Sequence, residues 1–581
     1  MQKEVYHYPT LHFLSDVWIF INPYTVTFIA WSLVRSFASV LELAIPILLG
    51  KIIDILTKSQ DNTFLIKLVI GVAVIELLGP TIRLKSKYHL GILGTRIAKD
   101  IRLKGLAKVL ELDLAWHEET MSGAVMQKVS TGADSIKGLI KFLREDGYTI
   151  LIKITGALVV FGYLHIKYLL LLVAAIVSYL WVEYHWDIII NQQKNRESAT
   201  REQLFGRTYE FAHNIRTVKA LGIESAVKRK AADAEEKLFG ISNEVSLVMN
   251  RKWRIMQTVV AFFKSLFIIV VCIDVLRGYL SAGMVLVYIT YFHQVHGALN
   301  NISDSVDGLI ENKNGLYRFM TVLDSHSEVD AGKNLRSLSS IESTQFSNVS
   351  FRYKEKKVLS GLNFCINKGE RIGIVGQSGV GKSTLFKLLL KLYLPTQGDI
   401  LINSLPIQKI KRDSITKYLT IVPQDTEVFN LSFKDNITLT DTKVNNYRYK
   451  RALDISACSD IIKRLSTGDE TLIGEKGVRL SGGERQRLGI ARALYKDADV
   501  ILLDEATSHL DSKTEQQIIS AMALHLGKKT LIVIAHRLST LRTMDRILVF
   551  SRGRIAEEGT YSDLLASHGL FHRLHKLQAT S

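Results

Sequence analysis

Apolar and polar residues follow two different patterns along the chain. In roughly the first 300 residues the apolar positions form long runs, and six of these runs have the length of a transmembrane helix. A soluble core rarely contains six such runs in succession, so buried soluble helices are the weaker interpretation. The predicted membrane-spanning helices occupy about 24–50, 63–83, 148–165, 168–187, 255–277 and 284–302.

From Phe346 onward, short apolar segments alternate with helical patterns, which is typical of an α/β domain. This change of pattern and the length of 581 residues predict more than one domain. We expect a six-helix transmembrane domain over 1–325, a linker over 326–345 and a nucleotide-binding α/β domain over 346–581.

The net charge of +18 could indicate a nucleic-acid partner, but many Lys and Arg residues flank the apolar runs or lie in the loops between them. We therefore expect membrane lipid as a partner and no nucleic acid. The N-terminal residues show no signal or transit pattern, so no cleavage is expected. The three scattered cysteines are too few for a disulfide framework or a metal site: Cys272, Cys365 and Cys458.

The connections between the runs alternate between short and long. The long connections, about 84–147 and 188–254, are rich in Lys and Arg and have helical periodicity, so the membrane helices should continue beyond the bilayer. Basic loops stay in the cytoplasm. Both termini and the α/β domain should therefore be cytoplasmic, in a multi-pass protein of the cell membrane, with a bacterial inner membrane or a plasma membrane as the expected location.

Several charged residues lie inside the predicted spans, where each would cost roughly 2.5–3.5 kcal/mol if left unpaired. One interpretation is that these charges pair with one another and stabilise the structure. A second interpretation is that some of them line a substrate path. If neighbouring spans are antiparallel and joined by tight turns, the expected ion pairs are Arg35 with Glu76, Glu42 with Lys67, and Lys153 with Glu183.

One segment of the α/β domain has the spacing of a phosphate-binding loop. The strand RIGIV, 371–375, is followed by GQSGVGKST, which fits G-x-x-x-x-G-K-[ST]. The glycines let backbone N–H groups surround phosphate oxygens at a helix N-terminus. We expect Lys382 to reach the β- and γ-phosphates and Ser383 to ligate Mg²⁺. The predicted nucleotide-binding residues of this loop are Gly376, Gln377, Ser378, Gly379, Val380, Gly381, Lys382, Ser383 and Thr384.

Two acids end the apolar strand VILLDEA, 500–506. Asp504 is placed to hold Mg²⁺, directly or through water, and Glu505 is placed to polarise the attacking water as a general base. A further strand, TLIVIAH, ends in His536, where an imidazole could contact the γ-phosphate. Such acids or a lone histidine are more often structural, but after a complete phosphate loop we favour the catalytic interpretation.

The order of the motifs resembles the exporter-type ABC transporters over essentially the whole chain: Tyr353, GQSGVGKS, Gln424 in IVPQD, LSGGE, LLDEA, SHLD and His536. The resemblance implies a six-helix all-α transmembrane domain followed by an α/β P-loop nucleotide-binding domain that binds ATP and Mg²⁺. It also implies that Tyr353 stacks on adenine and that Gln424 is a catalytic residue linking Mg²⁺ to the membrane domain. Asp511 of SHLD should belong to the nucleotide site.

In this family the LSGGE motif binds the γ-phosphate of ATP held by a second nucleotide-binding domain. The matching residues are Ser481, Gly482 and Gly483. One chain has one set of motifs, so the resemblance implies a dimer. Glu505 and His536 are both present, which favours a homodimer over an assembly with a paralogous subunit, although the heterodimer stays open.

Two residues depart from the family pattern. Glu484 ends the LSGGE motif where Gln is commonest, and His509 stands in SHLD where Ala is usual. The family tolerates Glu at the position of Glu484. In the family the SHLD segment crosses the dimer interface, so the resemblance implies that His509 affects the communication between the two ATP sites.

The resemblance implies an ATP-driven exporter that works by alternating access, with coupling helices near 112–118 and 212–217 and a contact segment GEKG at 474–477. A lipid or lipid-linked oligosaccharide flippase is an alternative that differs only in cargo. An importer on the same fold is rarer, and a channel regulator is disfavoured because every hydrolytic residue is present. The cargo should be amphipathic: Tyr291 and His296 could line its cavity, although helix packing explains them equally well.

Overall fold

The computed structural model describes residues 10–58, 62–120, 122–327, 329–330, 335–439, 441, 443–474, 478–507, 510–525, 527, 529–535 and 537–579. Contacts within the chain divide it into two compact units. The first comprises Met1–Leu110 and Gly123–Asp324, and the second comprises Glu111–Ser122 and Ser325–Ser581. The second unit therefore includes a short segment from the middle of the helical region.

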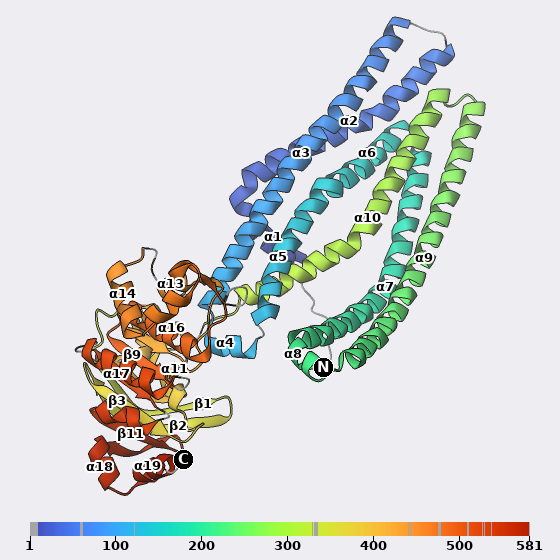
Figure 1. The fold of residues 1–581 in the computed structure, drawn as a ribbon. Coiled ribbons are helices and arrows are strands. Elements are labelled where there is room, and N and C mark those ends of the chain that lie inside the picture. The colour runs from blue at the N-terminus through green and yellow to red at the C-terminus, as the bar shows by residue number, and fades with distance from the viewer. Residues whose placement is uncertain are drawn as a thin grey trace. The chain divides into compact units, whose positions relative to one another are not determined.

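The first unit consists of helices in its described residues (Figure 1). Each of the six predicted apolar runs lies in a long helix, namely α2, α3, α6, α7, α9 or α10. The helices are α1 (Thr10–Ile21), η1 (Asn22–Tyr24), α2 (Thr25–Lys58), α3 (Asn62–Glu111), α5 (Ser122–Phe142), the π-helical η2 (Leu143–Gly147), α6 (Tyr148–Leu164), α7 (Ile166–His213), α8 (Ile215–Ala220), α9 (Glu224–Leu276) and α10 (Ala282–Leu323).

Several of these helices are longer than a bilayer is thick. The helices α3 and α9 contain 50 and 53 residues, whereas about 20 residues span the hydrocarbon core. These helices are therefore longer than a membrane span, and the helical periodicity predicted in the long connections is confirmed. Within the described residues, four segments are long and apolar enough to cross a membrane: Asn62–Glu111, Val125–Leu164, Ile166–Lys194 and Glu224–Leu276.

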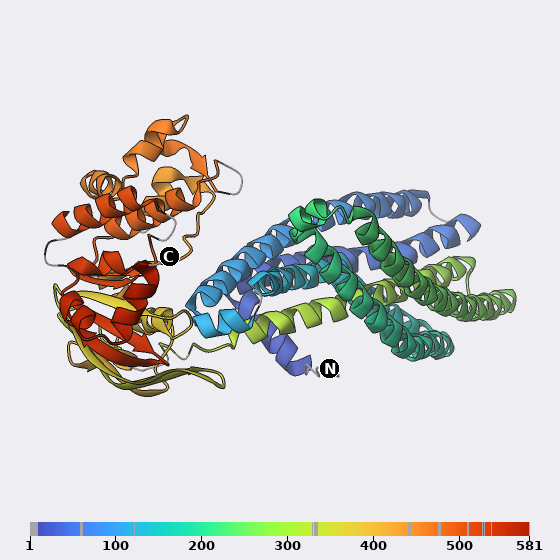
Figure 2. The ribbon, with the colours of Figure 1, turned by 60° about the horizontal axis from the view of Figure 1, so that its bottom comes forward.

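Helix α7 runs beside α9, and α10 packs against α2 and α6 (Figures 1 and 2). The hydroxyl of Tyr291, a fully buried residue of α10, donates a hydrogen bond to the backbone carbonyl of Leu43. His296 borders a cavity of about 20 Å³, which has room for about one water molecule. For Tyr291 and His296 the structure therefore favours helix packing over a ligand cavity.

The predicted pairing of Glu42 with Lys67 is wrong, because α2 is longer than that pairing assumed. The predicted register needs a turn near residue 55, whereas α2 continues to Lys58 and α3 begins at Asn62. Glu42 consequently lies opposite a later residue of α3. Its Oε1 is 3.0 Å from Nη1 of Arg83.

The predicted pairing of Arg35 with Glu76 is also wrong, because Arg35 binds the π-helical segment η2. Its guanidinium donates to the carbonyl oxygens of Arg144 and Glu145, at 3.1 and 3.2 Å, and to Oγ1 of Thr149, at 2.7 Å. In a π-helical turn the hydrogen bonds shift to residue i+5, which leaves backbone carbonyls open to other donors. These carbonyls compensate the burial of Arg35.

Glu183 of α7 pairs with Lys252 of α9 and not with Lys153, because α9 runs beside α7. Nζ of Lys252 lies 2.6 Å from Oε1 of Glu183 and 2.7 Å from Oδ1 of Asp187. Ser303 of α10 donates to the Glu183 carboxylate, at 2.8 Å from Oε1 and 2.7 Å from Oε2. Lys252 and Glu183 are each 6% exposed. This buried network joins three helices.

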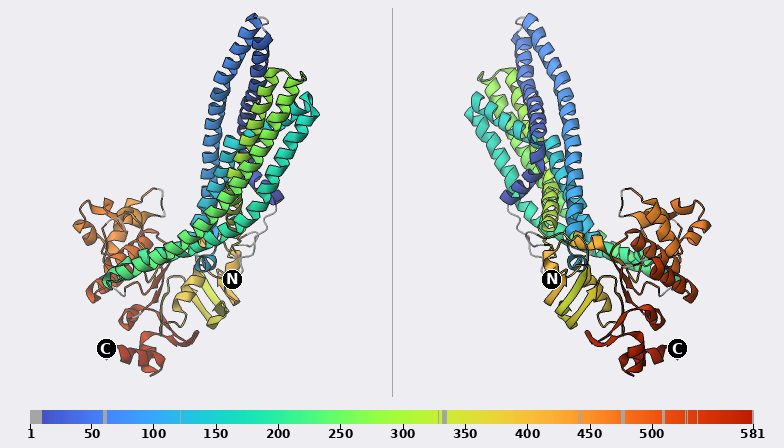
Figure 3. Two further views of the ribbon diagram at one scale, coloured as in Figure 1. Left: turned by 90° about the vertical axis from the view of Figure 1, so that its right-hand side faces the viewer. Right: turned by 90° about the vertical axis from the view of Figure 1, so that its left-hand side faces the viewer.

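The second unit contains two main sheets, which Figure 3 shows. One is a six-stranded sheet in the order β12-β11-β3-β10-β9-β6, and the other is a four-stranded antiparallel sheet in the order β2-β1-β4-β5. The strands are β1 (Ser343–Tyr353), β2 (Lys356–Asn367), β3 (Arg371–Gly376), β4 (Gln397–Ile402), β5 (Leu405–Pro406), β6 (Leu419–Val422), β9 (Val500–Asp504), β10 (Thr530–Ile534), β11 (Arg546–Ser551) and β12 (Arg554–Gly559), with β7 (Leu431–Ser432) pairing β8 (Leu472–Ile473).

Helices cover these sheets and form a small helical layer of their own. The buried face of that layer includes Phe433, Tyr449, Leu488 and Tyr495. The helices of the second unit are α4 (Leu114–Glu119), α11 (Lys382–Leu389), η3 (Ile407–Lys409), α12 (Arg412–Tyr418), α13 (Phe433–Thr438), α14 (Asn446–Ile455), α15 (Ser459–Arg464), η4 (Gly468–Glu470), α16 (Gly482–Tyr495), α17 (Ser512–His525), η5 (Leu538–Thr543), α18 (Tyr561–Ala566) and α19 (Leu570–Ala579). The predicted order, helical region first and α/β domain second, is confirmed.

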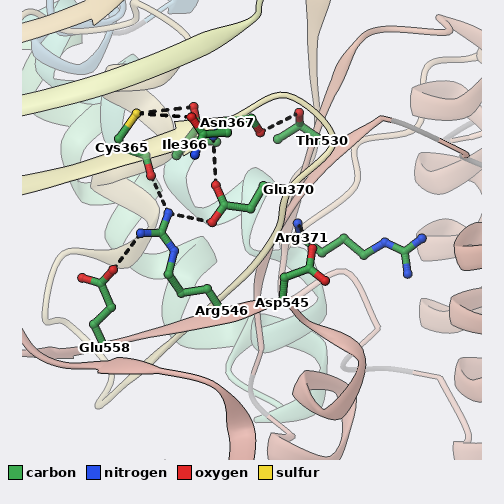
Figure 4. Close-up of polar contacts among 9 residues, drawn as sticks. All are labelled: Cys365, Ile366, Asn367, Glu370, Arg371, Thr530, Asp545, Arg546 and Glu558. Atoms are coloured by element: carbon green, nitrogen blue, oxygen red, sulfur yellow. Dashed lines mark hydrogen bonds and ion pairs between the residues drawn. The ribbon is translucent and has the colours of Figure 1, made fainter.

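Arg546, at the start of β11, connects the two sheets (Figure 4). Its guanidinium is 2.7 Å from Glu370, which precedes β3, and 2.7 Å from Glu558 of β12. It also donates to the backbone carbonyl of Cys365 in β2. One arginine thus joins the antiparallel sheet to the edge of the six-stranded sheet.

Candidate functional site

The parallel strands β3, β6, β9 and β10 end at one edge of the six-stranded sheet, where α/β proteins commonly bind ligands. Strand β9 is buried along its whole length, which explains its continuous apolar sequence VILLD. Three of these strands, β3, β6 and β9, deliver predicted site residues to that edge. The phosphate loop follows β3, Gln424 follows β6, and Asp504 ends β9.

The phosphate loop encloses the side chain of its own lysine. Gly379 and Gly381 adopt left-handed conformations, with φ of +81° and +102°, which residues with a Cβ rarely adopt. Nζ of Lys382 donates to the carbonyls of Gly376, at 2.8 Å, and Gln377, at 3.0 Å. Burial lowers the pKa of Lys382, while the nearby Glu505 and Asp504 carboxylates oppose this shift. The loop thus holds a cation at the N-terminus of α11.

Ser383 and Asp504 are brought together at the head of this helix. Oγ of Ser383 donates to Oδ1 of Asp504 at 3.1 Å. Asp504 is 7% exposed, and burial, together with the neighbouring Glu505 carboxylate, raises its pKa. A hydroxyl and a carboxylate oxygen side by side are the hard ligands that Mg²⁺ takes alongside phosphate oxygens. The residues therefore fit the predicted metal role.

Gln424 and Glu505 also meet, because Nε2 of Gln424 donates to Oε2 of Glu505 at 2.9 Å. Glu505 has a left-handed backbone, with φ of +49°, a conformation that costs a non-glycine residue of order 1–3 kcal/mol and is common at functional sites. Its backbone N–H donates to the carbonyl of Ile534 in β10, at 3.0 Å, and this bond holds the turn. The carboxylate is thereby fixed just beyond the end of β9.

Tyr353 ends β1 and lies near the phosphate loop. Its hydroxyl oxygen is 3.5 Å from Oγ1 of Thr384. The edge-to-face partners of its ring are Phe351 and Tyr393, with centroids 4.8 and 5.3 Å away. This position suits the predicted contact with a nucleotide base, which stays a prediction.

The LSGGE motif begins α16, and its serine caps that helix. Oγ of Ser481 accepts the backbone N–H of Glu484 at 3.3 Å, and the Glu484 carboxylate accepts the backbone N–H of Ser481 at 2.8 Å. The two residues form a capping box. Glu484 also pairs with Arg464 of α15 at 2.7 Å. In this chain Glu484 therefore has a structural function that includes an ion pair, while Ser481 itself is exposed.

The other predicted residues include a helix cap, two coupling segments and several residues that lie outside the described ranges. Asp511 caps α17 by accepting the backbone N–H of Thr514 at 3.0 Å, and this bond lowers its pKa. His536, His509 and the last three residues of GEKG lie outside the described residues. The first predicted coupling segment, 112–118, largely coincides with α4, and the second, 212–217, spans the end of α7 and the start of α8.

Sequence reasoning missed two residues that contact Tyr353 and one that contacts Glu484. Lys387 lies five residues beyond Lys382 on α11, with its Nζ 5.5 Å from the Tyr353 ring centroid. Tyr393 contacts the same ring, and Arg464 binds Glu484. None of them belongs to a recognisable motif, because their roles depend on partners that are distant in the sequence.

Comparisons with known proteins extend this description. Residues 28–299 match the model of the ABC transporter transmembrane region, and residues 359–508 match the ABC transporter model. An ATM1-type heavy metal exporter from Novosphingobium aromaticivorans is 32% identical over 81% of this chain and 78% of its own length. An ATP-dependent lipid A-core flippase from Syntrophus aciditrophicus is 30% identical over 84% of this chain and 81% of its own. A solved bacterial Atm1-family ABC exporter with ATP bound has a TM-score of 0.86 at 28% identity, covering 96% of this chain and 98% of that one.

Proposed function

Because the chain belongs to the exporter-type ABC transporters, with the transmembrane region and the ATP-binding domain in one polypeptide, we propose that it exports an amphipathic substrate across the cell membrane. ATP hydrolysis would drive this transport, and the ATP-binding domain and both termini would be cytoplasmic. The observation that carries the proposal is the meeting of the Ser383–Asp504 and Gln424–Glu505 pairs beside the phosphate loop.

The residues at this edge divide the chemistry among them. Lys382 would exchange its carbonyl partners for the β- and γ-phosphate oxygens of ATP. Ser383 Oγ and Asp504 Oδ1 would hold Mg²⁺, with Gln424, and the bound ion would neutralise charge on the phosphates. Glu505 would accept the proton of the attacking water at its carboxylate, as a general base. From its place in the sequence, His536 would complete this catalytic set by contacting the γ-phosphate.

We propose that two copies of the chain form the working transporter. The phosphate loop is exposed at Gln377, Ser378 and Gly379, and the signature serine Ser481 is exposed at the start of α16. In a head-to-tail pair, Ser481, Gly482 and Gly483 of one copy would complete the ATP site of the other, with Asp511 beside it. A homodimer is favoured because Glu505 is present. A paralogous partner is the alternative.

ATP would act through a difference in binding between two states. A ligand shifts a conformational equilibrium only as far as its affinities for the two states differ. ATP clamped between two nucleotide domains contacts both of them, so it would favour the closed pair. The coupling helices would then turn the inward-open cavity outward, and hydrolysis would reopen the pair.

A lipid or lipid-linked oligosaccharide flippase is the second candidate function. The similarity to a lipid A-core flippase over 84% of this chain favours it. The two candidates share the site chemistry and differ in cargo. Stimulation of the ATPase by lipids, compared with stimulation by soluble amphipathic compounds, distinguishes them.

The decisive experiment is the ATPase rate of the purified chain in lipid nanodiscs, with Glu505→Gln as the control. A rate well above the control is expected, because one kind of chain would build complete sites with itself. A rate equal to the control would contradict the homodimer. Adding a co-purifying subunit that restores the rate would then identify the heterodimer.

A further inference from the structure

The short helix α4 is held within the second unit by polar contacts at both of its ends. At the start, the Asp113 carboxylate accepts two hydrogen bonds. The Ser327 hydroxyl donates to Oδ1 at 2.5 Å, and the backbone N–H of Val329 donates to Oδ2 at 3.2 Å. At the end, Glu118 and Glu119 each pair with a lysine of the nucleotide domain. Because α4 connects α3 to α5 in the chain, it links the second unit to these two helices through the backbone.

Glu118 is shared by two side chains that follow the phosphate loop. Its Oε1 accepts Nζ of Lys387 at 3.2 Å, and its Oε2 accepts the hydroxyl of Tyr393 at 2.5 Å. Partial burial opposes the charge, but the hydrogen bonds from Tyr393 and Lys387 hold the pKa of Glu118 below its usual value. Glu118 is therefore ionised near neutral pH and can bind both groups at once.

Lys387 also faces the ring that is expected to carry the adenine base. Its Nζ is 5.5 Å from the centroid of the Tyr353 ring and 5.6 Å from that of Tyr393. The two rings meet edge to face, with an interplanar angle of 88°. A cation over a ring face is attracted by the ring quadrupole. The orientation of Tyr353 thus depends on Lys387 and Tyr393, and both of these depend on Glu118.

We propose that Glu118, Lys387 and Tyr393 are positioning residues that couple base binding at Tyr353 to the placement of α4. The inference rests on the proposed exporter function and on the proposed stacking of adenine on Tyr353. A base stacked on Tyr353 fixes the Tyr353 ring. The fixed ring then keeps Lys387 over its face and beside Glu118. Displacement of α4 withdraws Glu118 and frees Lys387. Coupling between two sites is reciprocal, so a bound base and a docked α4 stabilise each other.

The test measures nucleotide binding by the full-length chain in nanodiscs, in a Glu505→Gln background that prevents hydrolysis. The two probes are ATP and ribose 5′-triphosphate, which has the phosphates but no base. Glu118→Gln should weaken ATP binding about fivefold, the effect of losing one charge-assisted hydrogen bond and loosening one cation–π contact. Binding of ribose 5′-triphosphate should stay unchanged. Equal weakening of both probes would overturn the proposal, because it would indicate a distorted phosphate loop.

Glu119 provides a matched control on the same helix. It pairs with Lys354 at 3.1 Å, and the side chains of Lys354 and Glu119 are 77% and 60% exposed. Glu119→Gln should bind both probes like the parent. An equal loss of ATP affinity in Glu119→Gln and Glu118→Gln would assign the effect to the docking of α4 in general and overturn the relay. Tyr393→Phe, which keeps the ring and removes the hydroxyl, should give a smaller loss that is again confined to ATP.

A charge swap separates the relay from a merely structural ion pair. Glu118→Lys combined with Lys387→Glu restores the pair, but it places a carboxylate near the face of the Tyr353 ring. The melting temperature should recover relative to either single change, while ATP affinity should not. Recovery of both would mean that the pair is structural. Failure of the exporter proposal would appear in a separate measurement, as an absence of ATP hydrolysis by the parent chain without the Glu505→Gln change.

Discussion

The two units of the molecule bury charges for different purposes. In the nucleotide unit, Lys382 donates to two carbonyls of its own loop, and a ligand can replace these partners. In the helical unit, Lys252 and Glu183 take partners from three helices, and the network is closed by Ser303. The first arrangement keeps a charge available for chemistry, and the second uses charges to hold helices together. Substitution of Lys382 in the nucleotide unit should therefore change activity, and substitution of Lys252 in the helical unit should change stability.

The largest expected effect comes from Lys382→Met. The change removes the cation at the phosphates, so ATPase activity should fall by about 10²–10³-fold, the typical loss on removing one electrostatic stabiliser. The melting temperature should hardly change, because Lys382 makes only replaceable contacts. Steady-state hydrolysis and thermal unfolding in nanodiscs measure the two quantities.

Lys391 is the matched control in the same unit. Its side chain is fully buried, with Nζ 2.7 Å from Asp330 and 2.6 Å from the carbonyl of Ile410. Lys391→Met should lower the melting temperature without changing the KM for ATP. A stable Lys391→Met protein with weak ATP binding would remove the distinction between a lysine kept for a ligand and a lysine kept for the fold.

Lys252→Met tests the helical unit. It leaves the Glu183 and Asp187 carboxylates without their cation, and removal of one partner of a buried ion pair costs about 3–5 kcal/mol. The chain should lose folded protein at a lower temperature in detergent, as measured by fluorescence-detected size exclusion. Lys237→Met, on the exposed surface of α9, is the control and should unfold like the parent. Equal stability of both variants would contradict the structural role of the network.

Arg546→Met breaks the connection between the two sheets of the nucleotide unit. The change removes the arginine from Glu370, Glu558 and the Cys365 carbonyl, so we expect a loss of about 1–3 kcal/mol in unfolding free energy. Chemical denaturation of the purified chain measures it. Arg554→Met removes an exposed neighbour whose contact to Ser360 is 3.5 Å long, and it should cost far less. ATP affinity should be unchanged in both variants.

The smallest effect belongs to Glu484→Gln. Gln can close the same capping box, so the change removes mainly the ion pair with the exposed Arg464, worth about 0–1 kcal/mol. Partial burial opposes the charge, yet the Ser481 and Arg464 contacts hold the pKa of Glu484 below its usual value. The stabilisation should therefore be present at neutral pH and disappear as the pH falls through that lowered pKa. The melting temperatures of the parent and the variant should converge as the pH is lowered from neutral through this pKa, and a constant difference down to the pH of acid unfolding would contradict this.

The sequence indicated correctly which residues lie together at the strand ends, because they belong to short motifs there. The parallel order of β3, β6 and β9 then brings Ser383 to Asp504 and Gln424 to Glu505. The remaining site contacts could not be predicted in this way. Glu118 and Lys387 are 269 residues apart, and no local pattern connects them.

The charged residues of the long helices show the same limit of prediction from sequence. For Arg35, Glu42 and Glu183 the expectation of compensating partners is confirmed. Their partners depend on where a turn lies and on a local change of helix type, as Arg35 and η2 demonstrate. A shift of a few residues in helix length changes which side chains face each other along the whole pair of helices.

The short segment Glu111–Ser122 has a consequence for how such proteins can be recombined. It lies between two membrane helices in the chain, yet it packs as part of the nucleotide unit. A chimaera joined near residue 325 would carry α4 from one parent onto the nucleotide domain of another. Glu118 would then meet whichever residues that domain has at the positions of Lys387 and Tyr393. The interchangeable piece of this protein is therefore discontinuous, and a transplanted nucleotide domain should bring its own α4 with it.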